Sequence, residues 1–359
     1  MIPLDWREGD FARRVVDWQR THGRHGLPWQ SREPYRVWLS EVMLQQTQVS
    51  TVLAYYTRFL ARFPDVATLA AAPLDDVLAA WSGLGYYRRA RFLHACAQAV
   101  VERHGGRFPQ DPEQLAALPG IGRSTAAAIA AFCFDRRAAI LDGNVKRLLA
   151  RALGFGADLA VASHERELWQ AACALLPAEP AEMPAYTQGL MDLGATVCTP
   201  RRPTCLVCPL RAGCVALATG RVEQLPVKTR KLQRGRRANA WLWVEHAGRV
   251  WLQQRAALGV WAGLWSLPMF DDEDSLLAAA AGVPLRALAP IEHALTHFDW
   301  RLAPWHAEPR SADEAEALVA RLGGADAGRW IARAALADIA LPAPLRKLLV
   351  ADAATSPAP

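Results

Sequence analysis

Four cysteines in one short segment restrict most strongly what this chain of 359 residues can fold into. Cys198, Cys205, Cys208 and Cys214 follow a helical stretch in the pattern C-x6-C-x2-C-x5-C. Cysteines this close in sequence are typical metal ligands. Structural zinc sites usually have two C-x2-C pairs separated by a longer span, whereas this loop has only one. The spacing therefore predicts a [4Fe–4S] cluster, with structural zinc or free thiols as the alternatives.

The composition is that of a globular protein without a membrane span. Apolar residues make up 52% of the chain and charged residues 21%, which is enough apolar surface to form cores. The N-terminal segment has acids and arginines where a signal peptide has an apolar run. Cys96, Cys133 and Cys173 are expected to be core residues, and the odd total of 7 cysteines argues against a disulfide framework. We expect a cytoplasmic protein, associated with the nucleoid. The net charge of +6 is compatible with a polyanionic partner but does not identify one.

The length favours two domains. Up to about residue 218 the apolar residues recur at helical spacing. Residues 226–237 form a basic, poorly apolar stretch that is typical of a linker. Beyond it, the run WLWVEHAGRVWLQQR predicts a β-hairpin, and two later stretches predict helices. We predict a helical domain over 1–225, a linker over 226–237 and an α+β domain over 238–355.

A glycine-containing turn, LPGIGRST at residues 118–125, joins two predicted helices. Gly120 and Gly122 permit a tight hairpin, and the N–H groups at the start of the next helix can hold a phosphate without side chains. An ordinary interhelical turn is the alternative. The cysteine loop downstream favours the helix-hairpin-helix interpretation and hence DNA binding.

The order of these parts resembles the helix-hairpin-helix DNA glycosylases that carry an iron–sulfur loop. The resemblance narrows to the adenine DNA glycosylases of the MutY type at four segments, which are LPWQ (27–30), WLSEVMLQQTQV (38–49), GLGYYRRAR (83–91) and MDLGATVC (191–198). It implies a mainly α catalytic domain, a C-terminal α+β Nudix-like domain, and removal of adenine mispaired with 8-oxoguanine or guanine. The implied partner is double-stranded DNA, and we expect a monomer with no membrane partner.

Glu41 matches the family's catalytic glutamate. In a helix expected to start near Pro34 and to extend past Gln45, Glu41 and Gln45 lie beside an apolar stripe that contains Trp38 and Val42. A glutamate on a helix is usually solvated. Its apolar neighbours and the match to the family favour the functional interpretation. An apolar pocket would raise the pKa of Glu41 and keep it protonated, as a general acid requires.

Asp142 and Asn144, in the segment LDGNVKR, are the other predicted catalytic residues. Asp142 can cap the following helix, and in the family it faces the sugar, where a carboxylate stabilises the developing cation. Both roles can coexist, and a covalent adduct with Asp142 stays open. Asn144 would orient either Asp142 or the water.

Ser124 occupies the place where strand-cleaving members of the superfamily have a lysine that attacks the sugar. This favours a monofunctional, water-using enzyme. The first alternative is a glycosylase and AP lyase that acts on pyrimidine lesions. The second is a damage-binding protein without activity, which would not need Glu41 and Asp142 together.

The resemblance assigns further residues to DNA and base recognition. The adenine-pocket positions are Leu27, Trp29, Gln30 and Gln188, and Gln45 lies on the same predicted face as Glu41. Gln46 and Tyr86 match the intercalating residues, and Thr296 and His297 match the loop that reads 8-oxoguanine. Leu295 replaces the aromatic residue that the family usually has in this loop. The C-terminal domain lacks the acidic box of a Nudix hydrolase, so no hydrolase activity is expected from it.

Overall fold

The computed structural model describes residues 6, 9–229 and 233–353. Residues 230–232 of the predicted linker and residues 354–355 of the predicted C-terminal domain lie outside this description. The chain divides into two compact units, of which one comprises residues 1–70 and 95–231 and the other residues 71–94 and 232–359. No helix among the described residues is long and apolar enough to cross a membrane.

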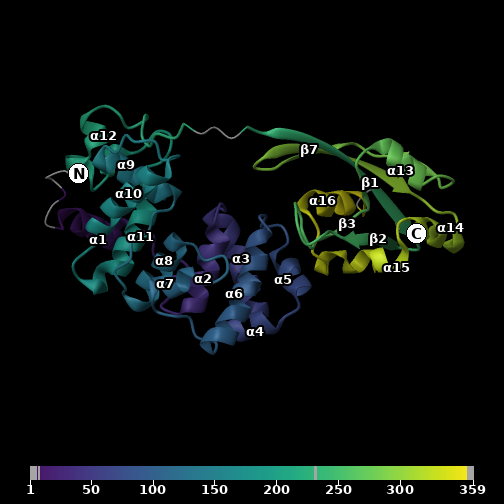
Figure 1. The fold of residues 1–359 in the computed structure, drawn as a ribbon, viewed down its shortest axis with the longest axis horizontal. Coiled ribbons are helices and arrows are strands. Elements are labelled where there is room, and N and C mark those ends of the chain that lie inside the picture. Colours follow the sequence, from purple (N-terminus) through teal and green to yellow (C-terminus); the bar gives the residue numbers. More distant parts are fainter. Residues whose placement is uncertain (1–5, 7–8, 230–232, 354–359) are drawn as a thin grey trace. The chain divides into compact units, whose positions relative to one another are not determined.

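The chain is helical up to residue 218, as the apolar spacing predicts (Figure 1). The α-helices of this part are α1 (Asp10–His22), α2 (Pro34–Leu44), α3 (Val49–Arg62), α4 (Val66–Ala71), α5 (Leu74–Trp81), α6 (Arg88–His104), α7 (Pro112–Ala116), α8 (Arg123–Phe134), α9 (Gly143–Leu153), α10 (Ala162–Ala174), α11 (Met183–Asp192) and α12 (Val215–Ala218). Short helical turns are η2 (Pro180–Glu182), the π-turn η3 (Leu193–Val197), η4 (Cys205–Val207) and η5 (Arg211–Gly213).

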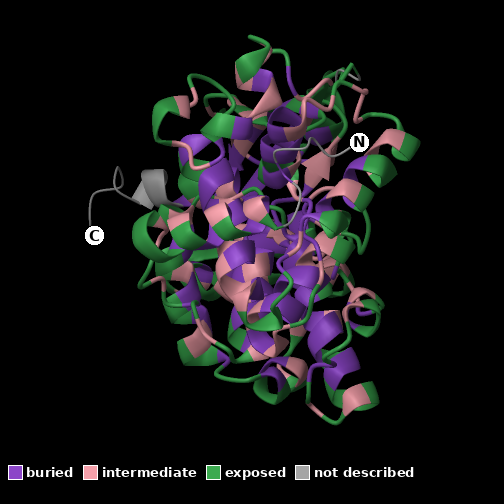
Figure 2. Ribbon diagram, turned by 90° about the vertical axis from the view of Figure 1, so that its left-hand side faces the viewer, coloured by how far each residue is buried: buried purple, intermediate pink, exposed green. Residues whose placement is uncertain are grey.

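One core cluster of the first unit includes residues of α1, α9 and α11. Phe11 and Val15 of α1 pack in one buried cluster with Leu148 and Leu149 of α9 and with Tyr186 of α11. In Figure 2 the exposed residues lie mostly on the outward turns of the helices and in the loops. The amphipathic pattern of these helices thus places one face of each against the core.

Helix α2 is shorter than the sequence predicts. The side chain of Glu33 caps its start by accepting hydrogen bonds from two backbone N–H groups. The helix ends at Leu44, and Gln46 adopts a left-handed conformation with φ 55° before α3 begins. The prediction that Gln45 continues the helix is therefore wrong, because this residue lies in the turn between α2 and α3.

The isolated cysteines are buried in two of three cases. Cys96 and Cys133 are in the core, as predicted, but Cys173 is exposed. Helix α10 buries Trp169 and Ala172, and the residue after Ala172 is turned by about 100° from that face.

The second unit contains a mixed sheet. Its strands are β1 (Gly235–His246), β2 (Arg249–Gln254), β3 (Trp265–Ser266), β4 (Met269–Phe270), β5 (Leu285–Ala287), β6 (Ile291–Ala294), β7 (Phe298–Ala307) and β8 (Gly328–Ala332). Its later helices are α13 (Glu273–Ala279), α14 (Ala312–Arg321), α15 (Gly324–Ala327), η6 (Arg333–Asp338) and α16 (Ala343–Ala353). The strand order is β3-β2-β1-β7-β5, with β4 on β1, β6 on β7 and β8 on β2.

The central strand β1 pairs in parallel with β7, and its residues 240–244 are buried on both faces. Leu242 and Val244 pack in one cluster with residues of α13 and α14. On the alternate positions, the ring of Trp243 lies 4.4 Å from that of His306. This explains why WLWV reads as a continuous apolar run.

The predicted β-hairpin is present between β1 and β2. Ala247 and Gly248 form its turn with φ values of 48° and 68°, as a type I′ turn requires. Strand β1 already begins at Gly235, inside the stretch that was predicted as the linker. The predicted late helices correspond to α14 and α16.

Residues 71–94 belong to the second unit and are tied to it by polar contacts. Asp75 accepts hydrogen bonds from Gln254 Nε2 at 3.0 Å and from Trp265 Nε1 at 3.3 Å. The hydroxyl of Tyr87 donates to the carbonyl of Leu341 at 3.0 Å. A segment from the helical half of the sequence is thus part of the unit that contains the sheet.

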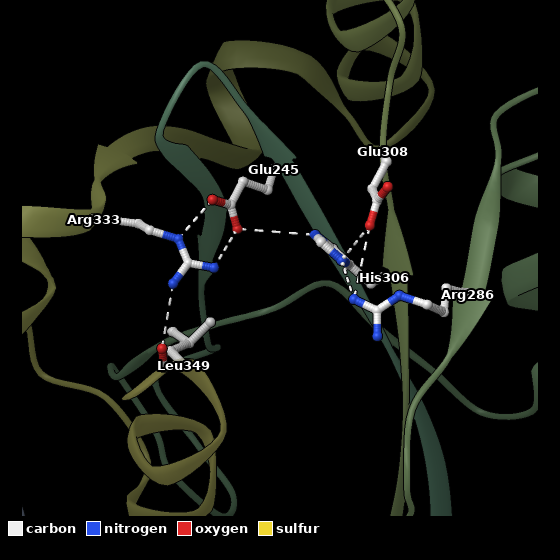
Figure 3. Close-up of polar contacts among 6 residues, drawn as sticks. All are labelled: Glu245, Arg286, His306, Glu308, Arg333 and Leu349. Carbon is white, nitrogen blue, oxygen red and sulfur yellow. Dashed lines mark hydrogen bonds and ion pairs between the residues drawn. The ribbon is translucent and has the colours of Figure 1, made fainter. Parts of the chain in front are cut away.

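A polar network crosses the sheet of the second unit (Figure 3). Glu245 accepts hydrogen bonds from Arg333 Nε at 2.6 Å and Nη2 at 2.7 Å. His306 Nδ1 lies 3.1 Å from Glu308 and 3.1 Å from Arg286 Nη2, and its Nε2 lies 3.9 Å from Glu245. The network joins β1, β5 and β7 to η6.

Candidate functional site

A pocket of about 390 Å³ lies within the first unit. Its volume is in the range of about 300–1,000 Å³ that is usual for small-molecule sites. Leu27, Trp29, Gln30, Glu41 and Gln188 all line it. The structure thus brings the four predicted adenine-pocket residues together with the predicted general acid, although Gln188 is distant from the others in sequence.

Glu41 lies on α2 at the wall of this pocket, which the apolar residues Val37 and Phe132 also line. Burial raises the pKa of its carboxyl to about 8, and the negative charge of Asp142 contributes to the same shift. Two consequences follow. Glu41 is protonated at neutral pH, and the two carboxyl groups are close enough to interact.

Asp142 is the N-cap of α9. Its Oδ1 accepts hydrogen bonds from the N–H of Asn144 at 2.7 Å and from that of Val145 at 3.0 Å. The start of a helix is a favourable place for a negative charge. Helix capping and electrostatic contact with Glu41 therefore coexist in one carboxylate, and the backbone fixes its position.

Ser124 holds the segment that leads to Asp142. Its Oγ accepts a hydrogen bond from the N–H of Leu141 at 3.0 Å. The hydroxyl therefore links the first turn of α8 to the residue before the capping aspartate.

The side chain of Asn144 is turned toward Arg147. Arg147 Nη2 donates to Asn144 Oδ1 at 2.9 Å and to the carbonyl of Gly194 at 2.6 Å, and its Nε donates to the carbonyl of Cys198 at 2.8 Å. Asn144 thus contacts Asp142 through its backbone N–H, and its side chain contacts Arg147, which joins α9 to the segment that contains the first cysteine. Arg147 is buried, and the sequence interpretation did not include it.

The side chain of Gln30 stabilises the loop that contains Leu27 and Trp29. Its Nε2 donates to the carbonyl of Arg24 at 2.7 Å, and its Oε1 accepts from the N–H of Leu27 at 2.9 Å. Trp29 is buried, and its ring meets that of Tyr56 edge-on at 5.4 Å. Gln30 therefore lines the pocket while both ends of its amide hold the loop.

Arg24 and Asp192 are polar residues at this site that sequence reasoning missed. Asp192 is fully buried and forms an ion pair with Arg24 at 2.6 Å, and Gln188 Nε2 donates to it at 2.8 Å. The spacing of Gln188 and Asp192, four residues apart on one helix, could have indicated that their side chains are neighbours.

The hairpin predicted at residues 118–125 joins α7 and α8. Leu118 and Ile121 are buried and anchor it, while Gly120 and Gly122 are exposed. Gly120 has φ 74°, which favours glycine, and Gly122 is the N-cap of α8. The backbone at the start of α8 is thus open to a ligand.

The predicted intercalating residues are both in left-handed conformations. Gln46 is exposed in the turn after α2, and Tyr86, in the second unit, is 48% exposed with φ 50°. Thr296 and His297 are the exposed central residues of the turn between β6 and β7. The hydroxyl of Tyr86 lies 3.3 Å from that of Thr296. The structure therefore brings one predicted intercalating residue next to one predicted lesion-reading residue.

The four clustered cysteines line one common cavity in the first unit. Buried Arg151 also lines it, and its Nη1 lies 3.4 Å from the sulfur of Cys198 and 2.7 Å from the carbonyl of Thr199. No group of three or more His, Cys, Asp or Glu side chains in the described part of the chain is arranged to hold a single metal ion. The donor set is entirely sulfur, which suits zinc and iron–sulfur clusters.

Comparison with known proteins identifies both halves of the chain. A family model described as HhH-GPD superfamily base excision DNA repair protein matches residues 39–172, and a NUDIX domain model matches residues 239–351. The adenine DNA glycosylase of Buchnera aphidicola subsp. Acyrthosiphon pisum (strain APS) is 36% identical over 268 residues, which are 74% of this chain and 76% of that protein. That of Homo sapiens is 43% identical over 226 residues, which are 60% of this chain and 41% of that protein.

A solved structure of a thermostable thymine-DNA glycosylase matches with a TM-score of 0.53 and 26% identity, over 60% of this chain and 99% of that one. The helical fold and its pocket, which contains Glu41, define a helix-hairpin-helix DNA glycosylase of base excision repair. The chain belongs to the adenine DNA glycosylase family, and its C-terminal part is Nudix-like. The predicted fold class and the predicted adenine glycosylase activity are thereby confirmed.

Proposed function

We propose that this enzyme, acting as a monomer on double-stranded DNA, removes adenine mispaired with 8-oxoguanine or guanine and leaves an abasic site. The observation that carries this proposal is the pair formed by Glu41 and Asp142. A carboxyl group with a pKa of about 8 shares its surroundings with a carboxylate that the backbone holds in place. This is the separation of acid and stabiliser that hydrolysis of a glycosidic bond requires.

In the proposed reaction the adenine nucleotide leaves the duplex, because the bond to be cut is inaccessible in the stack. The base enters the pocket beside Trp29 and Gln188, and Glu41 donates its proton to adenine N7. The glycosidic electron pair leaves with the base, and Asp142 stabilises the positive charge on the sugar. Water adds to the sugar carbon and loses a proton to solvent.

The reaction ends at the abasic site because Ser124 supplies no amine to attack the sugar. Its hydroxyl is instead the acceptor for the N–H of Leu141. We assign Ser124 the task of positioning Asp142, and Asn144 that of joining the start of α9 to Arg147.

Recognition of the partner base is assigned to exposed residues. Gln46 and Tyr86 would fill the space around the partner base in the opened duplex, with Gln45 beside Gln46 in the same turn. Thr296 and His297 offer a hydroxyl and an imidazole to the altered edge of 8-oxoguanine. Leu295 has no ring to stack there. The open backbone at Gly120 and Gly122 would bind a DNA phosphate.

The cysteine loop would hold a [4Fe–4S] cluster. Four thiols around one cavity, with a spacing that differs from the usual zinc pattern, support this proposal. When bound, the cluster would supply structural cross-linking, so that Arg201, Arg202 and Arg211 face a DNA backbone. Iron and sulfide analysis of anaerobically purified protein tests this, and one equivalent of zinc without sulfide would overturn it.

One incubation tests the proposed reaction. A duplex with a single 8-oxoguanine:adenine pair should yield an adenine strand that breaks only after alkali. Spontaneous strand breakage would instead indicate a lyase. Binding without any product would show that Glu41 and Asp142 do not act as proposed.

A further inference from the structure

Asp192 lies behind the adenine pocket and is held by donors alone. It is fully buried. Its Oδ2 accepts from the N–H of Arg24 at 2.8 Å, and its Oδ1 accepts from Arg24 Nε at 2.6 Å and from Gln188 Nε2 at 2.8 Å. Arg24 and Gln188 line the pocket and Asp192 does not. Asp192 can therefore affect a bound base only through these two residues.

The contact with Asp192 fixes the direction of the Gln188 amide. A carboxylate only accepts hydrogen bonds, so the amide must turn its nitrogen toward Asp192 and its oxygen away from it. In the described part of the chain, Gln188 Oε1 accepts no hydrogen bond. Because Gln188 lines the pocket, its Oε1 is left as a hydrogen-bond acceptor for a bound base.

The contact between the Asp192 carboxylate and Arg24 makes the arrangement rigid. Arg24 Nε and its backbone N–H donate to different oxygens of the carboxylate, and Asp192 itself is fully buried. The same loop is held by Gln30, whose amide bridges Arg24 and Leu27. Turning the Gln188 amide around would place its oxygen against the Asp192 carboxylate, which is strongly unfavourable in a buried site.

We infer that Asp192 is a specificity-positioning residue. By fixing the Gln188 amide it presents Oε1 to the base, which favours a purine with an amino group at position 6 and disfavours one with a carbonyl there. This inference rests on the proposed function, because it assumes that the flipped base occupies this pocket. It adds a reason why the pocket selects adenine over a base of nearly the same size and shape.

The test compares single-turnover excision of adenine, hypoxanthine and unsubstituted purine, each placed opposite 8-oxoguanine. Asp192→Asn keeps the size of the side chain but can accept or donate, so the Gln188 amide can turn. We expect the ratio of the adenine rate to the hypoxanthine rate to fall about tenfold or more, the effect of one mispaired polar contact to a base. Unsubstituted purine has neither the amino group nor the carbonyl at position 6. A lower rate on this base therefore measures a general loss of activity.

A double variant covers the case in which Asp192→Asn does not fold. In Asp192→Asn with Gln188→Glu, one amide and one carboxylate remain, with their places exchanged. The amide that replaces the side chain of Asp192 can donate to the carboxylate that replaces the side chain of Gln188. The other oxygen of that carboxylate still faces the base, so the preference for adenine should return. Asp17→Asn on α1 is the matched control, because that side chain is 59% exposed, and it should leave all three rates unchanged.

The outcomes separate this inference from the proposed function. If the unmodified chain excises no adenine, the proposed function is overturned and the inference with it. If it excises adenine but the adenine-to-hypoxanthine ratio is the same in Asp192→Asn, Asp192 does not set specificity. Should the single variant not fold, a double variant without the adenine preference leads to the same conclusion. Equal losses on all three bases would show that Asp192 only supports the fold.

Discussion

At the scale of single residues, one carboxyl group that lines the pocket and one that lies behind it have contrasting surroundings. Glu41 has apolar neighbours and a second carboxylate nearby, which keep it neutral, whereas Asp192 lies 2.6 Å from a guanidinium. The sequence predicted Glu41 because its neighbours on the helix are apolar and its segment matches a family. It did not predict Asp192, because the partner Arg24 is distant in sequence and pairing with it depends on how the loop before Leu27 folds.

Replacing Glu41 by Gln should abolish base excision. The amide has the size and polarity of the acid but cannot deliver a proton, and general acid–base catalysis is worth about 10²–10⁴-fold. Single-turnover rates on an 8-oxoguanine:adenine duplex measure the loss, and duplex binding by the same variant should be nearly unchanged. A rate above about a tenth of that of the unmodified enzyme would remove Glu41 from this role.

The pH dependence of excision should reflect the same group. The pKa of Glu41 is raised from 4.5 to about 8, so the neutral form prevails below this pH and is lost as the pH rises through it. The single-turnover rate should therefore fall about tenfold per pH unit well above pH 8. Rates measured from pH 6 to 10 check this, with duplex binding followed at each pH. A rate that rises through pH 8 would show that Glu41 acts as a base.

At the scale of elements, the spacing of apolar residues predicted the regular helices and the β-hairpin. It did not predict where a helix is interrupted. The β1–β2 turn was readable because a glycine follows Ala247 between two apolar runs. The end of α2 was not readable, because Gln45 and Gln46 continue the helical spacing and only the left-handed backbone of Gln46 ends the helix. The exposure of Cys173 was also not predicted. Its helix, α10, contains many small residues, so the sequence does not define the buried face sharply.

The network in Figure 3 should stabilise the sheet of the second unit. Glu245→Ala removes the acceptor for two Arg333 hydrogen bonds near a buried histidine, and the side chain is only 18% exposed. We expect the free energy of unfolding to fall by about 1–3 kcal/mol. Urea unfolding followed by tryptophan fluorescence measures it, and Glu292→Ala on the exposed side of β6 is the control. Equal stability of the two variants would show that the network contributes nothing.

At the scale of the whole molecule, the sequence indicated two domains but not which segments form them. Residues 71–94 read as helical and lie among helical neighbours, yet they group with the sheet-containing unit. Their attachment depends on single contacts, such as Asp75 with Trp265, that no periodicity reveals. The placement of Tyr86 beside Thr296 follows from this grouping and could not be anticipated from the chain order.

The assignment of lesion reading to the second unit can be tested in the full chain. Thr296→Ala with His297→Ala removes two polar groups from an exposed turn and should leave the fold intact. One good polar contact to a base contributes about 1–3 kcal/mol of discrimination, so the preference for 8-oxoguanine over guanine should fall about tenfold or more. Binding and single-turnover rates on both mispairs measure it. An unchanged preference would place lesion reading elsewhere, with Gln46 and Tyr86 as the next residues to examine.

The π-turn η3 separates the pocket-lining helix α11 from the first cysteine, and it makes the length of this stretch as important as its composition. A regular helix advances 1.5 Å and turns about 100° with each residue. Deleting one residue from Leu193–Val197 could restore ordinary helical geometry, yet it would turn Cys198 away from its present direction relative to Gln188 and Asp192. The composition is restricted as well, because a Cβ on Gly194 would lie 2.8 Å from Cβ of Asn144 and 3.1 Å from its backbone. Natural relatives that keep both sites should therefore keep the residue number of this stretch and the glycine at position 194.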